Sequence, residues 1–489
     1  MSEAFVIAVD QGTTGTAVHR LAASGAFEPL ATAQHKQIYR KPGWVEHNPE
    51  ELIAQVAAGL DKAAQSTSGA QGIGIANQGE TVVAWDSQTK QPVYNAIVWQ
   101  DARTQDRVDE LKAAGHEETT LARAGLPLDP YFSATKLRWI LDHVSEARDL
   151  RGEGRLRLGT SDAFFLDRLA GTCVTDVTTA SRTSLMNLGN LEWDPVLCDL
   201  FGVPIECLPK IVSTTSSPGG AIGEIQAGAA KGIPITASAV DQQAALFGHG
   251  CRQPGELKFT FGTGAFALCV TGETPLKDPG SGLLPTVAWR LDGGSATYAV
   301  DGGIYNAASA VNWARDIGLF SDFREIQAFG DCALARGLAF VPALSGLGCP
   351  YWDRSAGGLW LGLGLETTKS DMMQSILEGI AFRAGQVIGA MENLLPISRR
   401  LSIDGGLSNN GYFCEFLSRV LNRVLSVPAT VELTGLGIAQ LALIGAGLAT
   451  LDSLPAGPAP RQKITPADPI DPILIEKFRR AVDRSRKWR

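Results

Sequence analysis

The chain opens on the segment FVIAVDQGTTGT, residues 5–16, in which an apolar run leads into an acidic residue and a glycine-rich turn. The run Val6–Val9 is typical of a buried β-strand, and Gly12 and Gly15 allow the backbone to turn tightly. Threonine hydroxyls and backbone N–H groups in such a turn suit phosphate oxygens, and Asp10 suits a hydrated Mg²⁺ ion. No Lys follows the glycines, so the segment is not a Walker loop. An ordinary hairpin turn is the alternative.

The composition describes a globular protein with more than one domain. A chain of 489 residues is too long for a single hydrophobic core. Charged residues make up 19% of the chain, the net charge is −8, and the pI is about 5.4. These values argue against a nucleic-acid-binding surface. They are compatible with polyphosphate binding, because backbone N–H groups and Mg²⁺ provide that without a basic protein.

The cysteines and the apolar segments predict a cytoplasmic protein without a membrane anchor. Eight cysteines are scattered along the chain with no C-x-x-C pair, which predicts reduced thiols rather than a metal or disulfide framework. We expect no signal peptide before Asp10. The longest apolar stretch, Gly435–Leu451, is interrupted by Gln440 and by glycines and is too short to span a bilayer comfortably. We therefore predict a buried helix there and no membrane insertion.

Short apolar strands alternate with helical segments along the whole chain, which predicts an α/β protein. Near residue 250 a turn-rich segment, 248–255, is followed by a new strand that again ends in a Gly-Thr-Gly turn, Gly262–Gly264. The second half thus opens as the first does, which predicts two domains of similar plan. We place them at residues 1–249 and 250–489.

Residues 232–248 predict a strand, then Asp241, then a helix. An aspartate in this position commonly caps the helix. The carboxyl ends of strands in an open α/β sheet are, however, also where ligands bind. A carboxylate held there can accept the proton of a substrate hydroxyl as that hydroxyl attacks a phosphoryl group.

Two further predicted strands end in polar loops, Asn77–Thr81 and Trp99–Thr104. Such loops are usually only solvated. Carboxylates accept hydrogen bonds from hydroxyls, and an aromatic face covers C–H groups. The acidic and aromatic residues of these loops, taken together with Asp241, therefore resemble a site for a small polyhydroxylated molecule. The members of this set are Glu80, Trp99, Asp101 and Asp241.

A third predicted strand, residues 401–404, ends in a glycine turn that precedes a helix. Glycines at this turn permit the close approach of a ligand such as a nucleotide. A plain connection between strand and helix is the alternative.

Together these motifs resemble the FGGY carbohydrate kinases of the actin/hexokinase/heat-shock ATPase superfamily, and most closely the glycerol kinases. The likeness extends from about residue 5 to about residue 447. The two long family signatures are matched by 131–143 and by 358–363 continuing to 378. Shorter stretches similar to glycerol kinases are Lys41–His47, Tyr94–Gln100, Ala180–Thr183 and Asp241–Gly248.

The resemblance implies two RNase-H-like α/β domains with a catalytic cleft between them. The polyol would bind mainly the N-terminal domain, and ATP with Mg²⁺ mainly the C-terminal one. The implied reaction is ATP-dependent phosphorylation of a primary hydroxyl of a small polyol, with glycerol to glycerol 3-phosphate as the first candidate. Positioning and charge neutralisation supply most of the rate in such a transfer. The resemblance also implies a cytoplasmic homodimer or homotetramer.

The predicted site residues follow from the motifs and the resemblance together. Asp10 would organise Mg²⁺, and Asp241 would be the general base. The predicted polyol-binding residues are Gly79, Glu80, Trp99, Asp101, Tyr131, Asp241, Gln242 and Phe266. The predicted nucleotide-binding residues are Gln11, Thr13, Thr14, Thr263, Ala308, Asn312, Gly406, Leu407 and Asn410.

One departure from the glycerol kinases concerns the polyol loop, where they carry an arginine and this chain has Gly79. Losing a charged hydrogen bond costs roughly 1.5–3 kcal/mol, or about one to two decades in affinity. The enzyme would then bind glycerol weakly, or accept a larger polyol or a ketose in the vacated space. An arginine from elsewhere or a water filling the gap is another interpretation. The last interpretation is a non-catalytic sensor that keeps the fold without turnover. The presence of Asp10, Thr13, Thr263 and Asp241 argues against it.

Overall fold

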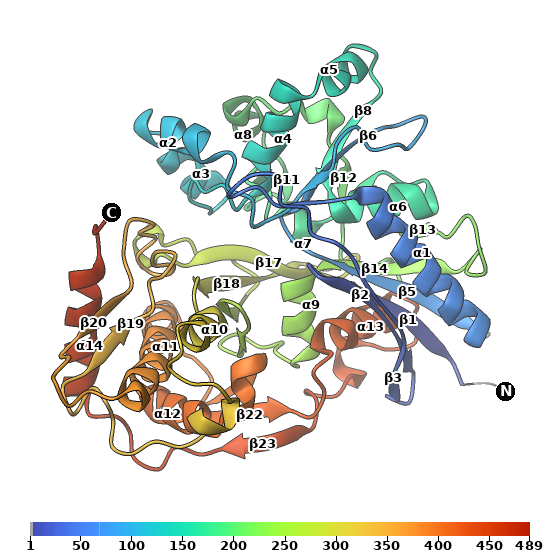
Figure 1. Ribbon diagram of the computed structural model, residues 1–489. Helices are drawn as coiled ribbons and strands as arrows, with labels where there is room; N and C mark the ends of the chain where they lie inside the picture. The colour runs from blue at the N-terminus through green and yellow to red at the C-terminus, as the bar shows by residue number, and fades with distance from the viewer. Residues whose placement is uncertain (1–2, 68) are drawn as a thin grey trace.

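The computed structural model describes residues 3–67 and 69–489 of the chain. Two large mixed β-sheets, one of six strands and one of seven, form the centres of two halves that are surrounded by helices (Figure 1). We call the half built on the six-stranded sheet the N-terminal lobe and the half built on the seven-stranded sheet the C-terminal lobe.

The opening segment of the chain forms the centre of the first sheet. β1 (Phe5–Gln11) pairs antiparallel with β2 (Gly15–Ala22) and parallel with β5 (Ala70–Asn77). Val6–Val9 are fully buried, as predicted, because the sheet is covered on both faces. The strand order is β13-β14-β5-β1-β2-β3, in which the remaining strands are β3 (Phe27–Gln34), β13 (Gly223–Glu224) and β14 (Pro234–Val240).

The second sheet repeats this plan. β15 (Leu257–Phe261) pairs antiparallel with β16 (Ala265–Gly272) and parallel with β21 (Arg400–Asp404), as β1 does with β2 and β5. The order is β17-β18-β16-β15-β21-β22-β23, and the remaining strands are β17 (Leu284–Arg290), β18 (Ala296–Ile304), β22 (Val424–Pro428) and β23 (Pro460–Ile464). The two halves therefore share the plan that their similar openings predict.

Helices cover the sheets and bury their apolar faces. α1 (Pro49–Ser66) packs against β1, β2 and β3, and the Asn48 side chain caps it by accepting the N–H of Glu50 at 3.0 Å. In the C-terminal lobe, α11 (Lys369–Glu392) and α12 (Gly411–Leu421) pack against each other. Further helices are α6 (Ser161–Ala170), α7 (Val177–Ala180), α8 (Pro195–Phe201), α10 (Ala308–Asp316) and α14 (Pro472–Ser485).

A smaller sheet, in the order β4-β7-β6-β8, extends the N-terminal lobe at the top of Figure 1. Its strands are β4 (Glu46–His47), β6 (Val82–Asp86), β7 (Ala96–Ile97) and β8 (Leu156–Thr160). The helices of this region are α2 (Gln105–Ala113), α3 (Glu117–Arg123), α4 (Ser133–His143) and α5 (Ser145–Gly152). Because β6 follows Glu80 and β7 precedes Trp99, this sheet holds both loops that were predicted to bind a polyol.

Three further pairs of short strands complete the sheets. They are β9 (Val174–Asp176) with β12 (Lys210–Val212), β10 (Met186–Asn187) with β11 (Glu192–Trp193), and β19 (Ala339–Val341) with β20 (Leu359–Leu361).

The helix α13 (Leu433–Gly445) belongs to the second half of the chain but packs against β1, β5 and β14 of the first sheet. Almost every residue of α13 is buried, so the buried helix predicted in this apolar stretch is confirmed. It also crosses α9 (Asp241–Gly248) at very short range. The N-terminal lobe therefore contacts a helix from the second half of the chain, so the two lobes are not separated at one point of the sequence. The domain boundary at 249/250 stays a prediction.

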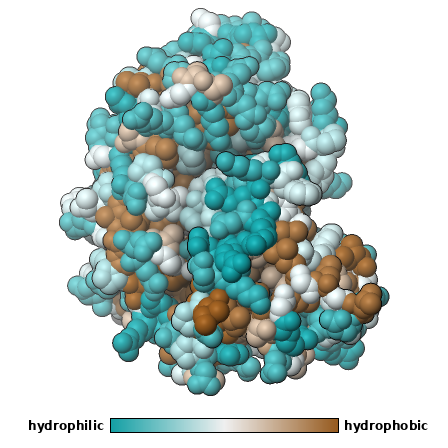
Figure 2. Space-filling model, turned by 90° about the vertical axis from the view of Figure 1, so that its left-hand side faces the viewer, coloured by the Kyte–Doolittle hydropathy of each residue, from teal (hydrophilic) through white to brown (hydrophobic). Residues whose placement is uncertain are grey.

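The surface offers no membrane-spanning element among the described residues, since no helix there is both long and apolar enough to cross a bilayer. Figure 2 shows the face that carries α14 and β20. This face is mostly hydrophilic, and its hydrophobic patches are separate rather than continuous.

Candidate active site

A cavity of about 110 Å³ lies where the two lobes meet. The predicted site residues that line it are Thr13, Gly79, Glu80, Trp99, Tyr131, Asp241, Gln242 and Phe266. The lining residues that were not predicted as site residues are Arg182, Val240, Gln243, Leu268 and Asp301. The loops at the ends of β1, β5 and β14 thus meet β16 and β18 of the other sheet at one place.

Asp241 is the first residue of α9, directly after β14. The residue at the cap position is Val240, so the interpretation of Asp241 as the cap residue is wrong, although Asp241 Oδ1 accepts the backbone N–H of Gln242 at 2.7 Å. Burial, followed by the negative charge of Glu80, raises the pKa of Asp241 to about 7. A carboxyl whose pKa lies near neutrality suits a general base.

Asp10, at the end of β1, fits a magnesium site. Burial, together with the negative charges of Asp241 and Glu432, raises the pKa of Asp10 to about 8, and a divalent cation would relieve that repulsion. No group of three or more His, Cys, Asp or Glu side chains gathers to hold a metal among the residues described. An Mg²⁺ ion here would therefore take most of its ligands from water and phosphate oxygens, as Mg²⁺ at nucleotide sites does. The neighbouring Gln11 is fully buried, and its Oε1 has no partner.

The turn Gly12–Gly15 joins β1 and β2 as a hairpin, and its Thr13 lines the cavity, so phosphate binding by this turn stays a prediction. His35 fastens it: its Nε2 lies 2.8 Å from the carbonyl oxygen of Thr13, and its backbone N–H donates to that of Thr14. The indole N–H of Trp99 donates to the Thr13 hydroxyl at 3.0 Å. The predicted phosphate turn and the predicted polyol wall are thus in direct contact.

Glu80 is buried and lines the cavity. Its backbone has a φ of 54°, in the left-handed region. Its Oε1 accepts a hydrogen bond from Arg182 Nε at 2.7 Å. Burial raises the pKa of Glu80, against the effect of Arg182. The rings of Trp99 and Tyr131 meet edge to face at 5.6 Å beside it, which gives the cavity an aromatic side.

Asp101 does not line the cavity. Its Oδ2 accepts the backbone N–H of Val45 at 2.6 Å, and Arg103 donates to both of its oxygens, at 2.9 and 2.7 Å. Arg103 also donates to Glu46 at 2.8 Å. Asp101 therefore holds the loop that bears Trp99, and the structure does not bring it together with the other predicted polyol-binding residues.

Among the residues predicted to bind the nucleotide, the Gly262–Gly264 turn abuts the start of α10 (Ala308–Asp316). The carbonyl oxygen of Thr263 accepts the N–H groups of Ala307 and Ser309 at 3.0 and 3.1 Å, and Ala308 donates to Gly262 at 2.9 Å. Thr263 is itself exposed, as is Asn312 one turn further along α10. The predicted phosphate turn and two predicted adenosine residues thus form one surface.

The glycine turn after β21, at Gly405 and Gly406, packs against the end of β15, just before the Gly262–Gly264 turn. Gly405 has a φ of 86°, and a Cβ atom there would lie 2.4 Å from the carbonyl oxygen of Phe261. Gly406 is exposed, whereas Leu407 is buried. The Asn410 side chain accepts the N–H of Phe413 at 2.8 Å and donates to Ile326 at 2.7 Å. Asn410 thus shapes this surface through its cap on α12.

Family models place the chain among known proteins. The FGGY family of carbohydrate kinases, N-terminal domain, matches residues 5–248, and the C-terminal domain of the same family matches residues 257–446. The chain belongs to the FGGY family of carbohydrate kinases. It is therefore an ATP-dependent carbohydrate kinase, as the resemblance implied.

Individual FGGY relatives match almost the whole chain. It is 42% identical to a glycerol kinase of Citrifermentans bemidjiense over 463 residues, which cover 92% of each chain. It is 38% identical to a glycerol kinase of Chromobacterium violaceum, over 100% of this chain and 99% of that one. The crystal structure of Plasmodium falciparum glycerol kinase with ADP matches with a TM-score of 0.90 and 30% identity, and covers 99% of this chain and 98% of that one.

These matches confirm the predicted fold class, two RNase-H-like α/β domains of the actin/hexokinase/heat-shock ATPase superfamily. A gluconate kinase from Lactobacillus acidophilus has a similar fold, with a TM-score of 0.85 at 22% identity over 99% of this chain and 97% of that one. At that identity the similarity shows a common fold and carries no conclusion about the substrate.

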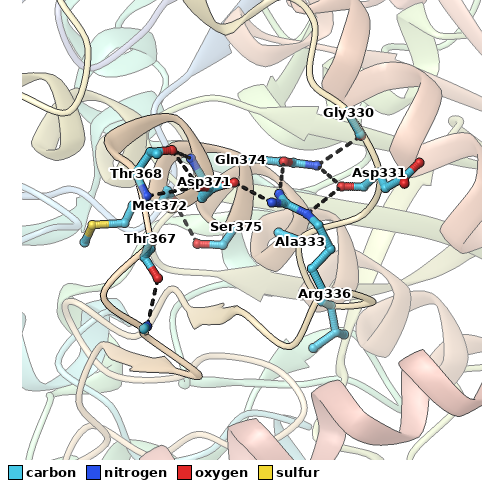
Figure 3. Close-up of polar contacts among 12 residues, drawn as sticks. Gly330, Asp331, Ala333, Arg336, Thr367, Thr368, Asp371, Met372, Gln374 and Ser375 are labelled. Carbon is cyan, nitrogen blue, oxygen red and sulfur yellow. Dashed lines mark hydrogen bonds and ion pairs between the residues drawn. The ribbon is translucent and has the colours of Figure 1, made fainter.

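The second FGGY signature lies outside the cavity and serves the C-terminal lobe. Figure 3 shows Arg336 donating to Asp371 at 2.6 Å and to Gln374 at 2.8 Å, while Gln374 donates to the carbonyl oxygen of Asp331 at 2.9 Å. Thr368 and Asp371 form a capping box that starts α11. The signature thus ties the loop around residue 331 to the first turns of α11.

Sequence reasoning also missed Lys258, which is fully buried as the second residue of β15. Its ammonium group donates to Gln242 Oε1 at 2.5 Å and to the Thr260 hydroxyl at 2.9 Å, and burial lowers its pKa. It therefore orients a predicted polyol-binding side chain across the two lobes. The signal in the sequence was a lysine between two apolar residues of a predicted strand, Leu257 and Phe259, where a charged side chain needs a buried partner.

Proposed function

We propose that the protein transfers the γ-phosphoryl group of ATP to a primary hydroxyl of glycerol and so forms glycerol 3-phosphate. The single observation that carries this proposal is the small cavity in which Asp241, Glu80 and Trp99 meet the phosphate turn at Thr13. The similarity to proteins named glycerol kinases, over nearly the whole chain, supports glycerol as the acceptor.

The proposed chemistry uses the groups that the cavity brings together. Asp241 accepts the proton of the substrate hydroxyl as the oxygen attacks the γ-phosphorus atom. Glu80 accepts hydrogen bonds from the other hydroxyls, and the rings of Trp99 and Tyr131 cover the carbon chain. Mg²⁺, when bound at Asp10, supplies positive charge next to the phosphates. Holding the two substrates together supplies a large share of the rate.

The charge of the cavity favours a neutral acceptor over an acidic one. Three carboxylates line it, those of Glu80, Asp241 and Asp301, and Arg182 is the one cationic side chain in the described lining. A sugar acid would add another negative charge to this set, whereas a polyol would not. Mg²⁺ as cofactor, cytoplasmic location and a homo-oligomeric state belong to the same proposal.

A panel of acceptors tests the proposal. With ATP and Mg²⁺, glycerol should show the highest kcat/KM among glycerol, erythritol, ribitol, xylulose and gluconate, with gluconate at least about 100-fold below glycerol. The measurement is ADP release by a coupled assay, with the phosphorylated product identified by mass. A pentulose or a four-carbon polyol turned over far better than glycerol would favour the alternative substrate class. No phosphoryl transfer to any acceptor would favour the non-catalytic sensor.

The raised pKa of Asp241 predicts the direction of the pH dependence. The base acts only as a carboxylate, so the rate should rise with pH as Asp241 loses its proton near pH 7. With ATP and Mg²⁺ saturating, so that the metal holds Asp10 as a carboxylate, kcat/KM for glycerol should fall about tenfold per pH unit below about pH 7 and level off above it. The profile is measured at constant ionic strength with an excess of coupling enzymes. A rate constant that is flat across the acidic range contradicts this assignment.

A further inference from the structure

Arg182 lies at the centre of the polyol side of the cavity. It follows α7, its side chain is only 5% exposed, and it lines the cavity. Its Nε donates to Glu80 at 2.7 Å, and its Nη2 donates to Asp301 Oδ2 at 3.1 Å. One guanidinium group therefore holds a carboxylate from the N-terminal lobe and one from the C-terminal lobe.

Two polar atoms of this cluster have no partner. Arg182 Nη1 is a buried donor without an acceptor, and Asp301 Oδ1 is a buried acceptor without a donor. Buried polar atoms of folded proteins are nearly always paired, so an unpaired donor and an unpaired acceptor on adjoining side chains need an explanation. A hydroxyl group both donates and accepts, and one hydroxyl between the two atoms would satisfy them together.

Position 79 offers no space for a second arginine. A Cβ atom on Gly79 would lie 2.7 Å from Val240 Cγ2, closer than side-chain carbons approach. The prediction that Gly79 leaves space is therefore wrong at the position of the side chain itself. Val240 lines the cavity as an apolar wall where a side chain at position 79 would begin.

We propose that Arg182 is the polyol-binding arginine of this protein, and that Val240 closes position 79 to an arginine. The ligand of Arg182 is a hydroxyl of a neutral polyol, which also donates to Asp301. Both unpaired atoms are covered in this conformation. The hydroxyl therefore reaches them when the Arg182–Asp301 contact between the lobes shifts. This inference rests on the proposed function and adds the residues that recognise the acceptor.

The first test compares Arg182→Lys and Arg182→Gln with the wild-type protein. Either change should raise the KM for glycerol by about 10- to 100-fold, the effect of losing one hydrogen bond from a charged donor, while the KM for ATP changes less than about threefold. Arg138→Lys is the matched control, since Arg138 pairs with Asp142 on the surface of α4. Its kinetic constants should equal those of the wild type.

A purely structural role of Arg182 would give a different result. Because Arg182 joins the lobes, its loss could lower the thermal midpoint and raise both KM values alike. Arg182→Lys keeps the charge beside Glu80 and Asp301, so it limits that effect. An unchanged glycerol KM in folded variants, or equal increases in both KM values, overturns the proposal for Arg182.

The second test concerns Val240. Gly79→Arg alone should lower kcat/KM for glycerol at least about tenfold, because the new side chain collides with Val240. Adding Val240→Gly should restore at least wild-type kcat/KM, and in an Arg182→Gln background the same pair should lower the glycerol KM about tenfold or more. A Gly79→Arg variant as active as the wild type, or a pair that restores nothing, overturns the role of Val240.

Binding measurements separate this inference from the proposed function. Calorimetric titration with glycerol in the presence of ADP should give a dissociation constant that is about 10- to 100-fold weaker in Arg182→Lys. A wild-type protein that binds glycerol without phosphorylating it would contradict the proposed function, and its titrations would still decide the role of Arg182. A wild-type protein that binds no polyol overturns both.

Discussion

Asp241→Asn is expected to lower kcat for phosphoryl transfer by about 10²- to 10⁴-fold, the usual contribution of a positioned general base. Asparagine has nearly the same size and shape as aspartate, so the cavity should keep its form. The Oδ1 of asparagine can still accept the backbone N–H of Gln242, which Asp241 Oδ1 accepts at 2.7 Å, so the helix should also keep its start. Nucleotide affinity, measured by titration with ADP, should change by less than about threefold.

The residual activity provides a second check on Asp241. Without an ionisable group at this position, the slow rate of the variant should no longer follow the ionisation near pH 7 that we expect for the wild type. Asp142→Asn is the matched control, because Asp142 is a partly exposed carboxylate in a surface ion pair on α4. An Asp241→Asn protein that retains more than about a tenth of the wild-type kcat would show that another group takes the proton.

Features carried by a single local segment were predictable from the sequence. The opening strand and its turn, the strand before Asp241 and the second Gly-Thr-Gly turn each combine apolar runs with glycines over a few residues. Such patterns depend on backbone sterics and burial, which act locally.

Residues brought in by the other half of the chain were not predictable in this way. Leu268 and Asp301 lie on β16 and β18, far along the chain from Glu80, and reach the cavity only because the lobes pack together. Asp301 is followed by Gly302 and Gly303, but these glycines continue β18 instead of turning the chain, so Asp301 lies inside the strand and not at its end. Asp101 shows the opposite error. Its position near Trp99 predicted contact with the polyol, but its carboxylate instead accepts hydrogen bonds from Arg103.

The position of Asp241 also depends on a helix that no sequence motif linked to it. α9, which begins at Asp241, crosses α13, and the crossing is close only because glycines lie at the contact. A Cβ atom on Gly437 would lie 1.8 Å from the carbonyl oxygen of Ala244, and one on Gly248 would lie 2.1 Å from that of Leu433. Atoms at those distances overlap, and backbone cannot move aside as a flexible side chain can.

Gly437→Ala is therefore expected to destabilise the protein by about 3 kcal/mol or more, although alanine is the better helix former. For a large domain this corresponds to a fall of roughly 6–12 °C in the thermal midpoint. The helices have to separate to admit the methyl group, and a displacement of about 1 Å at Asp241 would cost about 100-fold in kcat. Thermal unfolding followed by circular dichroism, together with steady-state kinetics of the folded variant, measures both effects.

Gly389→Ala provides the control for this crossing, because Gly389 lies inside α11 with no atom within 4 Å of the position of its Cβ. The same substitution there should raise stability by about 0.5–1 kcal/mol through helix propensity and leave kcat unchanged. The two variants differ only in what the added methyl group meets. If Gly437→Ala kept the wild-type midpoint and kcat, the α9–α13 contact would not be what holds Asp241 against the cavity.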